Sequence, residues 1–377
     1  MRPSTTALLT LALLAPAALA AQGTLSTQGL GYPSGQLSTR ALGTGGALGE
    51  IDPMSVSNPA SLLGLNGSAL YFQAEPEYRT LNVPGGSEHN TIARYPLVSA
   101  VVPLTERLFA GLSVTNLLDR SFTTITRGTS VVRDTALATT SLFSSDGAIG
   151  DVRLALAWAP ATWMHVGLAG HLITGENRLT AQLQFDDSTR YARLLDTSTV
   201  TYTGKAYSAG VELIAEGVGS VAGSYRKGGA ISLKHGDTTL RNGNVPDRIA
   251  VSAAYLGIKG TSIAFRTAKD RWSDLRGLVG SATRVTDSWD TSLGADVMGP
   301  RVGSNVLQLR VGGRWRTLPF AVGATDVTEK SLSIGGGTMF ARGRAALDVA
   351  GIRATRDGGS LGNEAAWTLS IGITVRP

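Results

Sequence analysis

Histidines and arginines are the side chains through which this chain could bind a metal ion or an anion. The four histidines are His89, His165, His171 and His235. His165 and His171 share one face of a strand-like segment, but six positions separate them, roughly 20 Å along an extended chain, which is too far for one metal ion. We therefore expect no metal site and assign the histidines to single polar positions.

A second candidate for chemistry is the glycine-rich run Gly43-Thr44-Gly45-Gly46. It lacks the full spacing of a phosphate-binding loop and follows no strand-like segment, so we expect no nucleotide site and no cofactor. A hydrolase that assembles a serine and a histidine across strands is the remaining enzymatic alternative. We expect no catalytic residue and predict that the protein is not an enzyme.

Three arginines, Arg310, Arg314 and Arg316, occupy the polar face of one strand-like segment. Guanidinium groups pair well with carboxylates, so they could hold the head group of an acidic ligand. They could equally pair with Asp290 and Asp296 of the preceding segment. We favour the structural pairing and keep Arg310 and Arg314 as candidate ligand contacts.

These polar residues belong to segments that alternate as β-strands do. In the last segment, Trp367, Leu369, Ile371, Ile373 and Val375 alternate with small or polar residues, so that one face is apolar and the other polar. About fourteen such segments follow residue 66. They are 67–76, 91–104, 106–116, 148–160, 162–174, 198–215, 218–233, 246–258, 260–270, 284–297, 304–316, 328–341, 343–356 and 365–376.

The connections between these segments alternate in length. A long connection is expected after the first segment, a tight one at Leu104-Thr105-Glu106, and so on along the chain. Outer-membrane barrels have this order, with short turns at the periplasmic end and longer loops outside. The segments Asp119 to Gly147 and Gly175 to Thr197 are rich in Ser, Thr, Asp and Arg, and we predict that both are external loops.

The start of the chain predicts export. Arg2, an apolar stretch from Ala7 to Ala17 and the small residues Ala18-Leu19-Ala20 are typical of a secretory signal peptide, which we assign to residues 1–20. The remaining sequence contains no apolar run of about 18 residues, so any membrane crossing must use strands. We predict an all-β fold, an antiparallel transmembrane β-barrel of about 14 strands over residues 66–377.

Aromatic residues near the ends of the predicted strands could form belts at the lipid–water boundary. They are Tyr71, Tyr95, Trp158, Trp163, Tyr255, Trp289, Trp315 and Trp367. The alternative is that aromatic residues are simply common in strands.

Residues 21–65 lack strand alternation and are rich in turn-forming residues. About 45 residues are too few for a good independent core, and the lumen of a fourteen-strand barrel is wide enough to need filling. We predict that this segment is a hatch inside the lumen, with a disordered tail as the alternative. Arg40, within it, is another candidate ligand contact.

The run from Ser38 to Ala47, followed by Asn58-Pro59-Ala60, resembles the amino-terminal hatch of the FadL-like outer-membrane transporters. The resemblance implies a fourteen-strand barrel, hatch movement, a lateral opening in the wall, and passive uptake of long-chain fatty acids or other hydrophobic small molecules. Asn58, Pro59 and Ala60 carry over as the hatch motif. Pro377 departs from the family, because such barrels usually end in an aromatic residue.

The expected location is the bacterial outer membrane, and the expected partners are its lipids and a hydrophobic small-molecule ligand. The formal charge is only +6 and no basic run is interleaved with aromatic residues, so we expect no nucleic acid. The alternative function is a non-transporting outer-membrane scaffold or a partner of a protein secretion system, since the barrel also resembles proteins of that kind.

Overall fold

The computed structural model describes residues 30–83, 86–132, 135–187, 190–279, 284–303, 305–322, 325–359 and 362–377. The predicted signal peptide lies outside these residues. The strands are β1 (Ala69–Val83), β2 (Gly86–Thr105), β3 (Leu108–Asp119), β4 (Phe122–Val132), β5 (Thr135–Ala161), β6 (Met164–Phe185), β7 (Leu194–Ala215), β8 (Gly219–His235), β9 (Thr238–Asn244), β10 (Arg248–Ile258), β11 (Thr261–Asp270), β12 (Ser288–Val302), β13 (Asn305–Val322), β14 (Thr325–Phe340), β15 (Ala345–Asp357) and β16 (Asn363–Val375).

The helical elements are short. They are α2 (Thr39–Gly43), η2 (Pro59–Gly64), η3 (Trp272–Leu278) and η4 (Ala341–Gly343). Among the described residues, none of the helices has the length and apolar character needed to cross a membrane.

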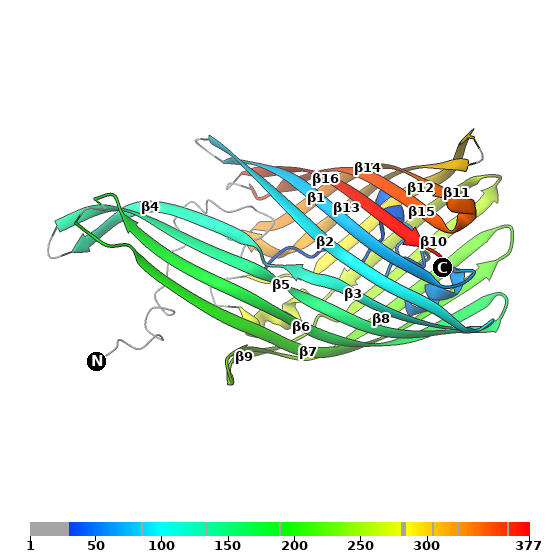
Figure 1. Cartoon of the computed structure of the whole chain (residues 1–377), viewed down its shortest axis with the longest axis horizontal. Helices are drawn as coiled ribbons and strands as arrows, with labels where there is room; N and C mark the ends of the chain where they lie inside the picture. Colours follow the sequence, from blue (N-terminus) through cyan, green and yellow to red (C-terminus); the bar gives the residue numbers. More distant parts are fainter. Residues whose placement is uncertain are drawn as a thin grey trace.

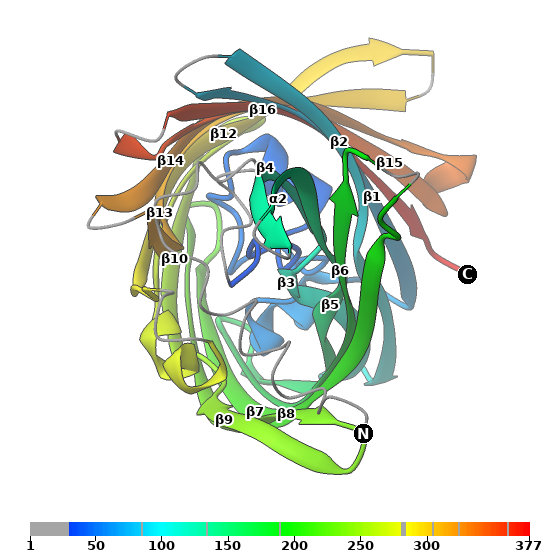
Figure 2. The same cartoon turned by 90° about the vertical axis from the view of Figure 1, so that its left-hand side faces the viewer.

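Fourteen of the sixteen strands in the described part of the chain form a closed antiparallel ring, as predicted (Figures 1 and 2). The ring closes where β16 pairs with β1, and it bypasses β9 where β8 pairs with β10. The other strand outside the ring, β4, pairs with β5. Closure gives each strand of the ring two neighbours, which removes the open edges that lipid could not satisfy with hydrogen bonds.

At one end of the ring, which also holds the start of β1 and the end of β16, every connection between strands is short. These connections join β2 to β3, β5 to β6, β7 to β8, β10 to β11, β12 to β13 and β14 to β15. We call this the turn end. Since barrels of this kind place short turns in the periplasm, the opposite end is the external one.

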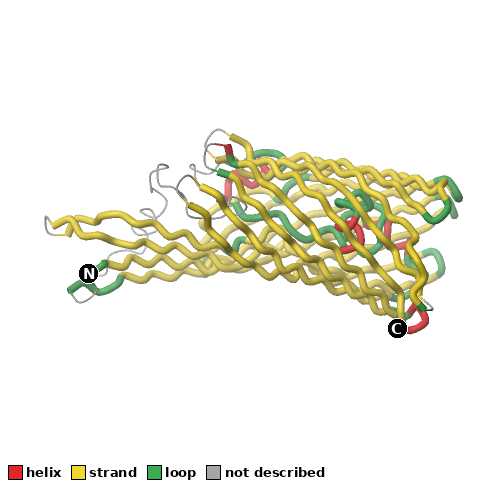
Figure 3. The backbone as a smooth tube through the Cα atoms, turned by 90° about the horizontal axis from the view of Figure 1, so that it is seen from above, coloured by secondary structure: helices red, strands yellow, loops and turns green. Residues whose placement is uncertain are grey.

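The two predicted external loops are wrong, because most of their residues extend the wall as strands. Residues 119–147 contain β4 and the first part of β5, and residues 175–197 contain the far ends of β6 and β7. These strands project beyond the rest of the barrel (Figures 1 and 3). Most residues on both faces of these projecting strands are exposed or half-buried, so no apolar alternation marks the strands in the sequence. The connection after β1 is also short, since β1 extends to Val83 and β2 begins at Gly86.

The outer face of the ring is apolar. On β12, Trp289, Leu293 and Val297 are exposed, whereas Asp290 and Asp296 are buried on the inner face. The apolar face from residue 289 to 297 has about the 9–11 residues that a tilted strand needs to cross a membrane. Seven of the eight predicted belt aromatics are exposed: Tyr95, Trp158, Trp163, Tyr255, Trp289, Trp315 and Trp367.

Tyr71 is the exception among the predicted belt aromatics. Only 2% of its surface is exposed, and its hydroxyl accepts a hydrogen bond from the Thr39 amide at 2.9 Å. Its side chain therefore points into the lumen, where residues 30–65 lie within the ring (Figure 2). Residues 30–65 of the predicted hatch, which was assigned to residues 21–65, therefore lie inside the barrel, and residues 21–29 are outside the described part of the chain. We call residues 30–65 the hatch.

A cation on the outer face should destabilise the barrel. Ile334, near the middle of β14, is 71% exposed, and Ile334→Arg is expected to lower the free energy of unfolding in lipid vesicles by about 2–4 kcal/mol, since the guanidinium would face acyl chains. Ile125→Arg on the projecting β4 is the control, and it is expected to change stability by less than about 0.5 kcal/mol. Equal losses would contradict the assignment of the two surfaces.

Candidate functional site

The hatch makes a circuit of the inner wall. Its α2 helix lies against β16, where the Thr39 hydroxyl is 2.8 Å from that of Ser370. The end of α2 contacts β14, where the Ser333 hydroxyl donates to the Gly43 carbonyl at 3.1 Å. Farther along, Glu50 accepts a hydrogen bond from the Ser224 hydroxyl of β8 at 2.6 Å. These contacts come from strands on different sides of the lumen, so the hatch spans it.

Wall glycines leave the space in which the hatch backbone lies. A Cβ atom at Gly294 or Gly312 would overlap the Thr44 carbonyl group, and one at Gly210 would overlap the Asn58 side chain. At Gly167 it would lie 2.5 Å from the Ala60 nitrogen. These glycines face inward on β12, β13, β7 and β6, and together they form a seat for the hatch.

The Asn58-Pro59-Ala60 motif fixes the later part of the hatch. Asn58 has an extended backbone before Pro59, with φ −113° and ψ 120°, as expected for a residue before proline. Its side-chain oxygen accepts from the Ala60 amide at 3.0 Å and so caps η2. Its side-chain nitrogen donates to the carbonyls of Glu50 at 2.9 Å and of Val211 at 3.4 Å. One amide group therefore joins two parts of the hatch to β7.

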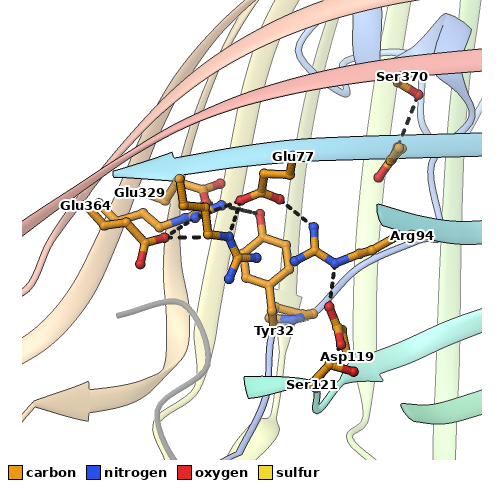
Figure 4. A network of polar contacts seen from close by, with 12 residues as sticks. Tyr32, Glu77, Arg94, Asp119, Ser121, Glu329, Glu364 and Ser370 are labelled. Carbon is orange, nitrogen blue, oxygen red and sulfur yellow. Dashed lines mark hydrogen bonds and ion pairs between the residues drawn. The ribbon is translucent and has the colours of Figure 1, made fainter. Parts of the chain in front are cut away.

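The amino-terminal end of the described hatch is held differently, by arginines around Tyr32 (Figure 4). The Cζ atoms of four arginines lie 4.7–5.5 Å from the centre of its ring, within the range of cation–π attraction. They are Arg79, Arg94, Arg316 and Arg356. The Tyr32 hydroxyl donates to Glu329 at 3.1 Å and accepts from Arg356 at 3.0 Å. We call this group, with its carboxylates, the Tyr32 clasp.

Carboxylates balance the four arginines of the clasp. Glu77 accepts from Arg79 at 2.6 Å, from Arg356 at 3.0 Å and from Arg94. Arg94 also donates to Asp119 at 2.6 Å. The remaining two acids are Glu329 and Glu364, both paired with Arg356. Charges buried at this density need such pairing, because an isolated buried ion would be strongly unfavourable.

Cavities lie on both sides of the hatch. The central cavity, about 120 Å³, adjoins residues 32–37 of the hatch and the arginine-rich wall from β8 to β15. The turn-side cavity, about 780 Å³, is lined by the hatch residues Arg40 and Asp52 and by the ends of β13 to β16. The hatch separates the two spaces.

The structure does not bring the three predicted ligand contacts together. Arg314 lines the central cavity, whereas Arg40 and Arg310 line the turn-side cavity. All three are paired, and Arg40 and Arg310 share Asp296 at 3.2 Å. Arg314 binds Asp290 through two nitrogens, at 2.7 and 2.6 Å. The pairing of strand arginines with Asp290 and Asp296 that the sequence suggested is present, and direct ligand contact by these arginines stays a prediction.

Arg316 behaves differently from its two neighbours. It pairs with Glu329 at 2.6 Å and also reaches Tyr32. Tyr32 was not predicted from the sequence, because it lies outside the strand-like segments whose aromatic residues were expected at the membrane boundary. Glu50 was missed as well, although it is the acidic residue of the hatch that pairs with both Arg248 and Arg266.

His171 lies within a hydrogen-bonded chain across three strands. Its Nδ1 is 2.9 Å from the Asp151 carboxylate, and its Nε2 is 2.8 Å from the Ser208 hydroxyl. The order Ser-His-Asp resembles a hydrolase triad, but neither Ser208 nor His171 lines the central cavity. We assign the chain a structural role, since it satisfies buried polar groups. His165 makes a separate pair with Glu212 at 3.4 Å.

A side chain at Gly167 should unseat η2. Gly167→Val is expected to destabilise the protein by about 1–3 kcal/mol through overpacking, to raise proteolysis within the hatch and to raise conductance in planar bilayers. Gly170→Val on the same strand is the control, because a Cβ there meets no described atom within 4 Å. Similar behaviour of the two variants would refute the glycine seat.

Removing the Tyr32 hydroxyl should loosen the first part of the hatch. Tyr32→Phe keeps the ring among the arginines but loses hydrogen bonds to charged groups worth about 1.5–3 kcal/mol each. We expect hydrogen exchange of residues 30–37 to become about tenfold to hundredfold faster, and faster again in Tyr32→Leu. Tyr71→Phe, which removes another buried hydroxyl at the hatch, should leave these amides unchanged. Unchanged exchange in Tyr32→Phe would argue against the clasp.

Several solved structures have the same architecture. A FadL homologue of Pseudomonas aeruginosa matches with a TM-score of 0.65 at 12% identity, covering 92% of this chain and 99% of its own. The CymD monoaromatic hydrocarbon channel matches with 0.58 at 15% identity, covering 94% and 99%. The toluene transporter TbuX of Ralstonia pickettii matches with 0.54 at 14% identity, covering 91% and 98%.

In sequence, no described protein family and no curated protein matches the chain. The structural likeness therefore establishes the fold, which agrees with the closed fourteen-strand ring, the apolar outer face and the hatch in the lumen. In its fold, the chain is a FadL-like transmembrane β-barrel of the bacterial outer-membrane type.

Proposed function

We propose that the protein is an outer-membrane channel for the passive uptake of hydrophobic small molecules. The observation that carries this proposal is a hatch that fills the lumen through noncovalent contacts and leaves a cavity on each side. A structural scaffold would not need such a divided lumen. Contacts among the described residues give no specific support to the secretion scaffold, and we do not propose it.

The cargo we favour is small. Two of the structures with this fold are described as a monoaromatic hydrocarbon channel and a toluene transporter. The central cavity of about 120 Å³ is similar in size to engineered cavities of about 150 Å³ that bind benzene. Long-chain fatty acids, which the resemblance implies, remain a second cargo class, and they would need a larger displacement of the hatch.

A hydrophobic molecule needs a route from the lumen into the membrane. The pairing of β3 with β5 shifts register between Asn116 and Leu118, and Leu117 lines the central cavity. Such bulges interrupt the ladder of hydrogen bonds locally. We place the lateral opening of the wall at this bulge.

Uptake can be tested in cells with and without the protein. We expect labelled toluene to enter faster in cells that contain it, and a parallel measurement with labelled oleate tests the fatty-acid cargo. Equal rates with and without the protein, for both compounds, would overturn the proposed function.

Transport should also require movement of the hatch. The chain has no cysteine, and Thr39 and Ser370 have hydroxyl oxygens 2.8 Å apart, so the double variant Thr39→Cys/Ser370→Cys can form one disulfide between hatch and wall. We expect oxidation to stop uptake and reduction to restore it. The two single variants are the controls. Undiminished uptake by the oxidised protein would show that this contact stays closed during transport.

A further inference from the structure

The central cavity is polar in a way that a passage for hydrocarbons does not require. At one end of it, guanidinium groups and carboxylates form a continuous chain of ion pairs. Its members are Arg226, Arg248, Arg266, Arg314, Glu50, Asp270 and Asp290. All of them except Glu50 line the cavity. We call this group the arginine end.

The charges at the arginine end do not balance. Four arginines face three carboxylates, which leaves a formal charge of +1 (four minus three). The Tyr32 clasp at the other part of the cavity has four arginines and four carboxylates, and Glu75, which lines the cavity near Arg94, adds a fifth carboxylate there. Arg153 and Asp151, next to the arginine end, add one charge of each sign. A monovalent anion would therefore complete the arginine end and not the clasp.

Two guanidinium nitrogens at the arginine end are buried without a hydrogen-bond partner among the described residues, namely Arg266 Nη2 and Arg248 Nε. The other two nitrogens of Arg266 are occupied, since Nε pairs with Glu50 at 3.3 Å and Nη1 with Asp290 at 2.9 Å. The Arg266 side chain has no exposed surface, so the unpartnered nitrogen is unfavourable as it stands. Because the nitrogen has no accessible surface of its own, an acceptor in the cavity would satisfy it after a small movement of the Arg266 side chain, which lines that cavity.

Apolar side chains lie beside these arginines. Gly49 is in close contact with both Leu37 and Arg266, since a Cβ on it would lie 2.7 Å from the first and 2.8 Å from the second. Trp272 lines the cavity two residues after Asp270. A molecule held by the arginines would therefore have Leu37 and Trp272 against its apolar part.

From the charge, the unpartnered nitrogens and the apolar lining, we propose that the central cavity binds a small aromatic monocarboxylate, with its carboxylate at Arg248 and Arg266 and its ring against Leu37 and Trp272. A cavity of about 120 Å³ accommodates about one six-membered ring. This inference rests on the proposed channel function and narrows its cargo. A neutral arene would leave the positive charge and the unpartnered nitrogens of the arginine end without a partner.

The test measures binding of benzoate to the purified full-length protein in detergent by calorimetry, with toluene as the neutral analogue of the same shape and inorganic phosphate as the anion without a ring. Benzoate should bind saturably and at least tenfold more tightly than either. Arg266→Gln should weaken benzoate binding about tenfold to hundredfold, as expected for the loss of a charge-assisted hydrogen bond. Equal affinities for benzoate and toluene, or for benzoate and phosphate, would overturn the proposal.

Glu212→Gln is the control. Glu212 is also a buried, charged residue of the lumen and pairs with His165, but it lines neither cavity, so benzoate affinity should not change. If Arg266→Gln unfolds, the three ligands with the wild-type protein still decide the question. If both variants weaken benzoate binding equally, the loss is general and the site is refuted.

The uptake assay separates the two proposals. Uptake of toluene without benzoate binding would refute the carboxylate site and leave the channel in place. Benzoate binding with no uptake of benzoate, toluene or oleate would refute the channel and leave the site.

Discussion

The position of the hatch depends on close contact between its backbone and inward-facing glycines of the wall. Gly167 and Gly312 show the constraint, because a single added carbon at either would occupy the place of a hatch atom. Packed interiors tolerate little added volume. The barrel ring could close without the hatch, since its hydrogen bonds run between strands, but the hatch could not take this path through a wall with larger residues. The inward-facing glycines of the wall therefore allow the hatch to occupy the lumen, on which the proposed channel function depends.

Charge pairing is the second constraint on the lumen, and it accounts for most of its arginines. Arg310 and Arg314 looked like ligand contacts in the sequence, yet both are held by aspartates. Burial makes this necessary, since removing one partner of a buried pair costs about 3–5 kcal/mol. An arginine that keeps a nitrogen unsatisfied after such pairing is consequently a better candidate for ligand contact than a fully paired one. Arg94 and Arg153 share this feature with Arg266, so the excess positive charge and the apolar lining are also needed to single out the arginine end.

The sequence predicted the ring well because the membrane imposes a simple rule on each strand, with apolar side chains outside and polar ones inside. The fourteen segments correspond to the fourteen strands of the ring, and the hatch was located by its composition and its Asn58-Pro59-Ala60 motif. This alternation is required only within the membrane. The strands that project beyond it, β4 and the far ends of β5, β6 and β7, were therefore predicted as loops. Tyr32 and the glycine seat were also missed, since both depend on contacts between residues far apart in the sequence.

The two ends of the hatch are held by different forces, and this difference suggests where opening begins. The later part, around Asn58, is seated in glycines and continues directly into β1, so it cannot leave without moving backbone. The first part, around Tyr32, is held by side chains of the clasp and by one short pairing with Asp119. Side chains can rearrange without breaking the wall, and a ligand anion could replace carboxylates as a partner for their guanidinium groups. Opening should therefore start at residues 30–37, which adjoin the central cavity, while the later part remains seated.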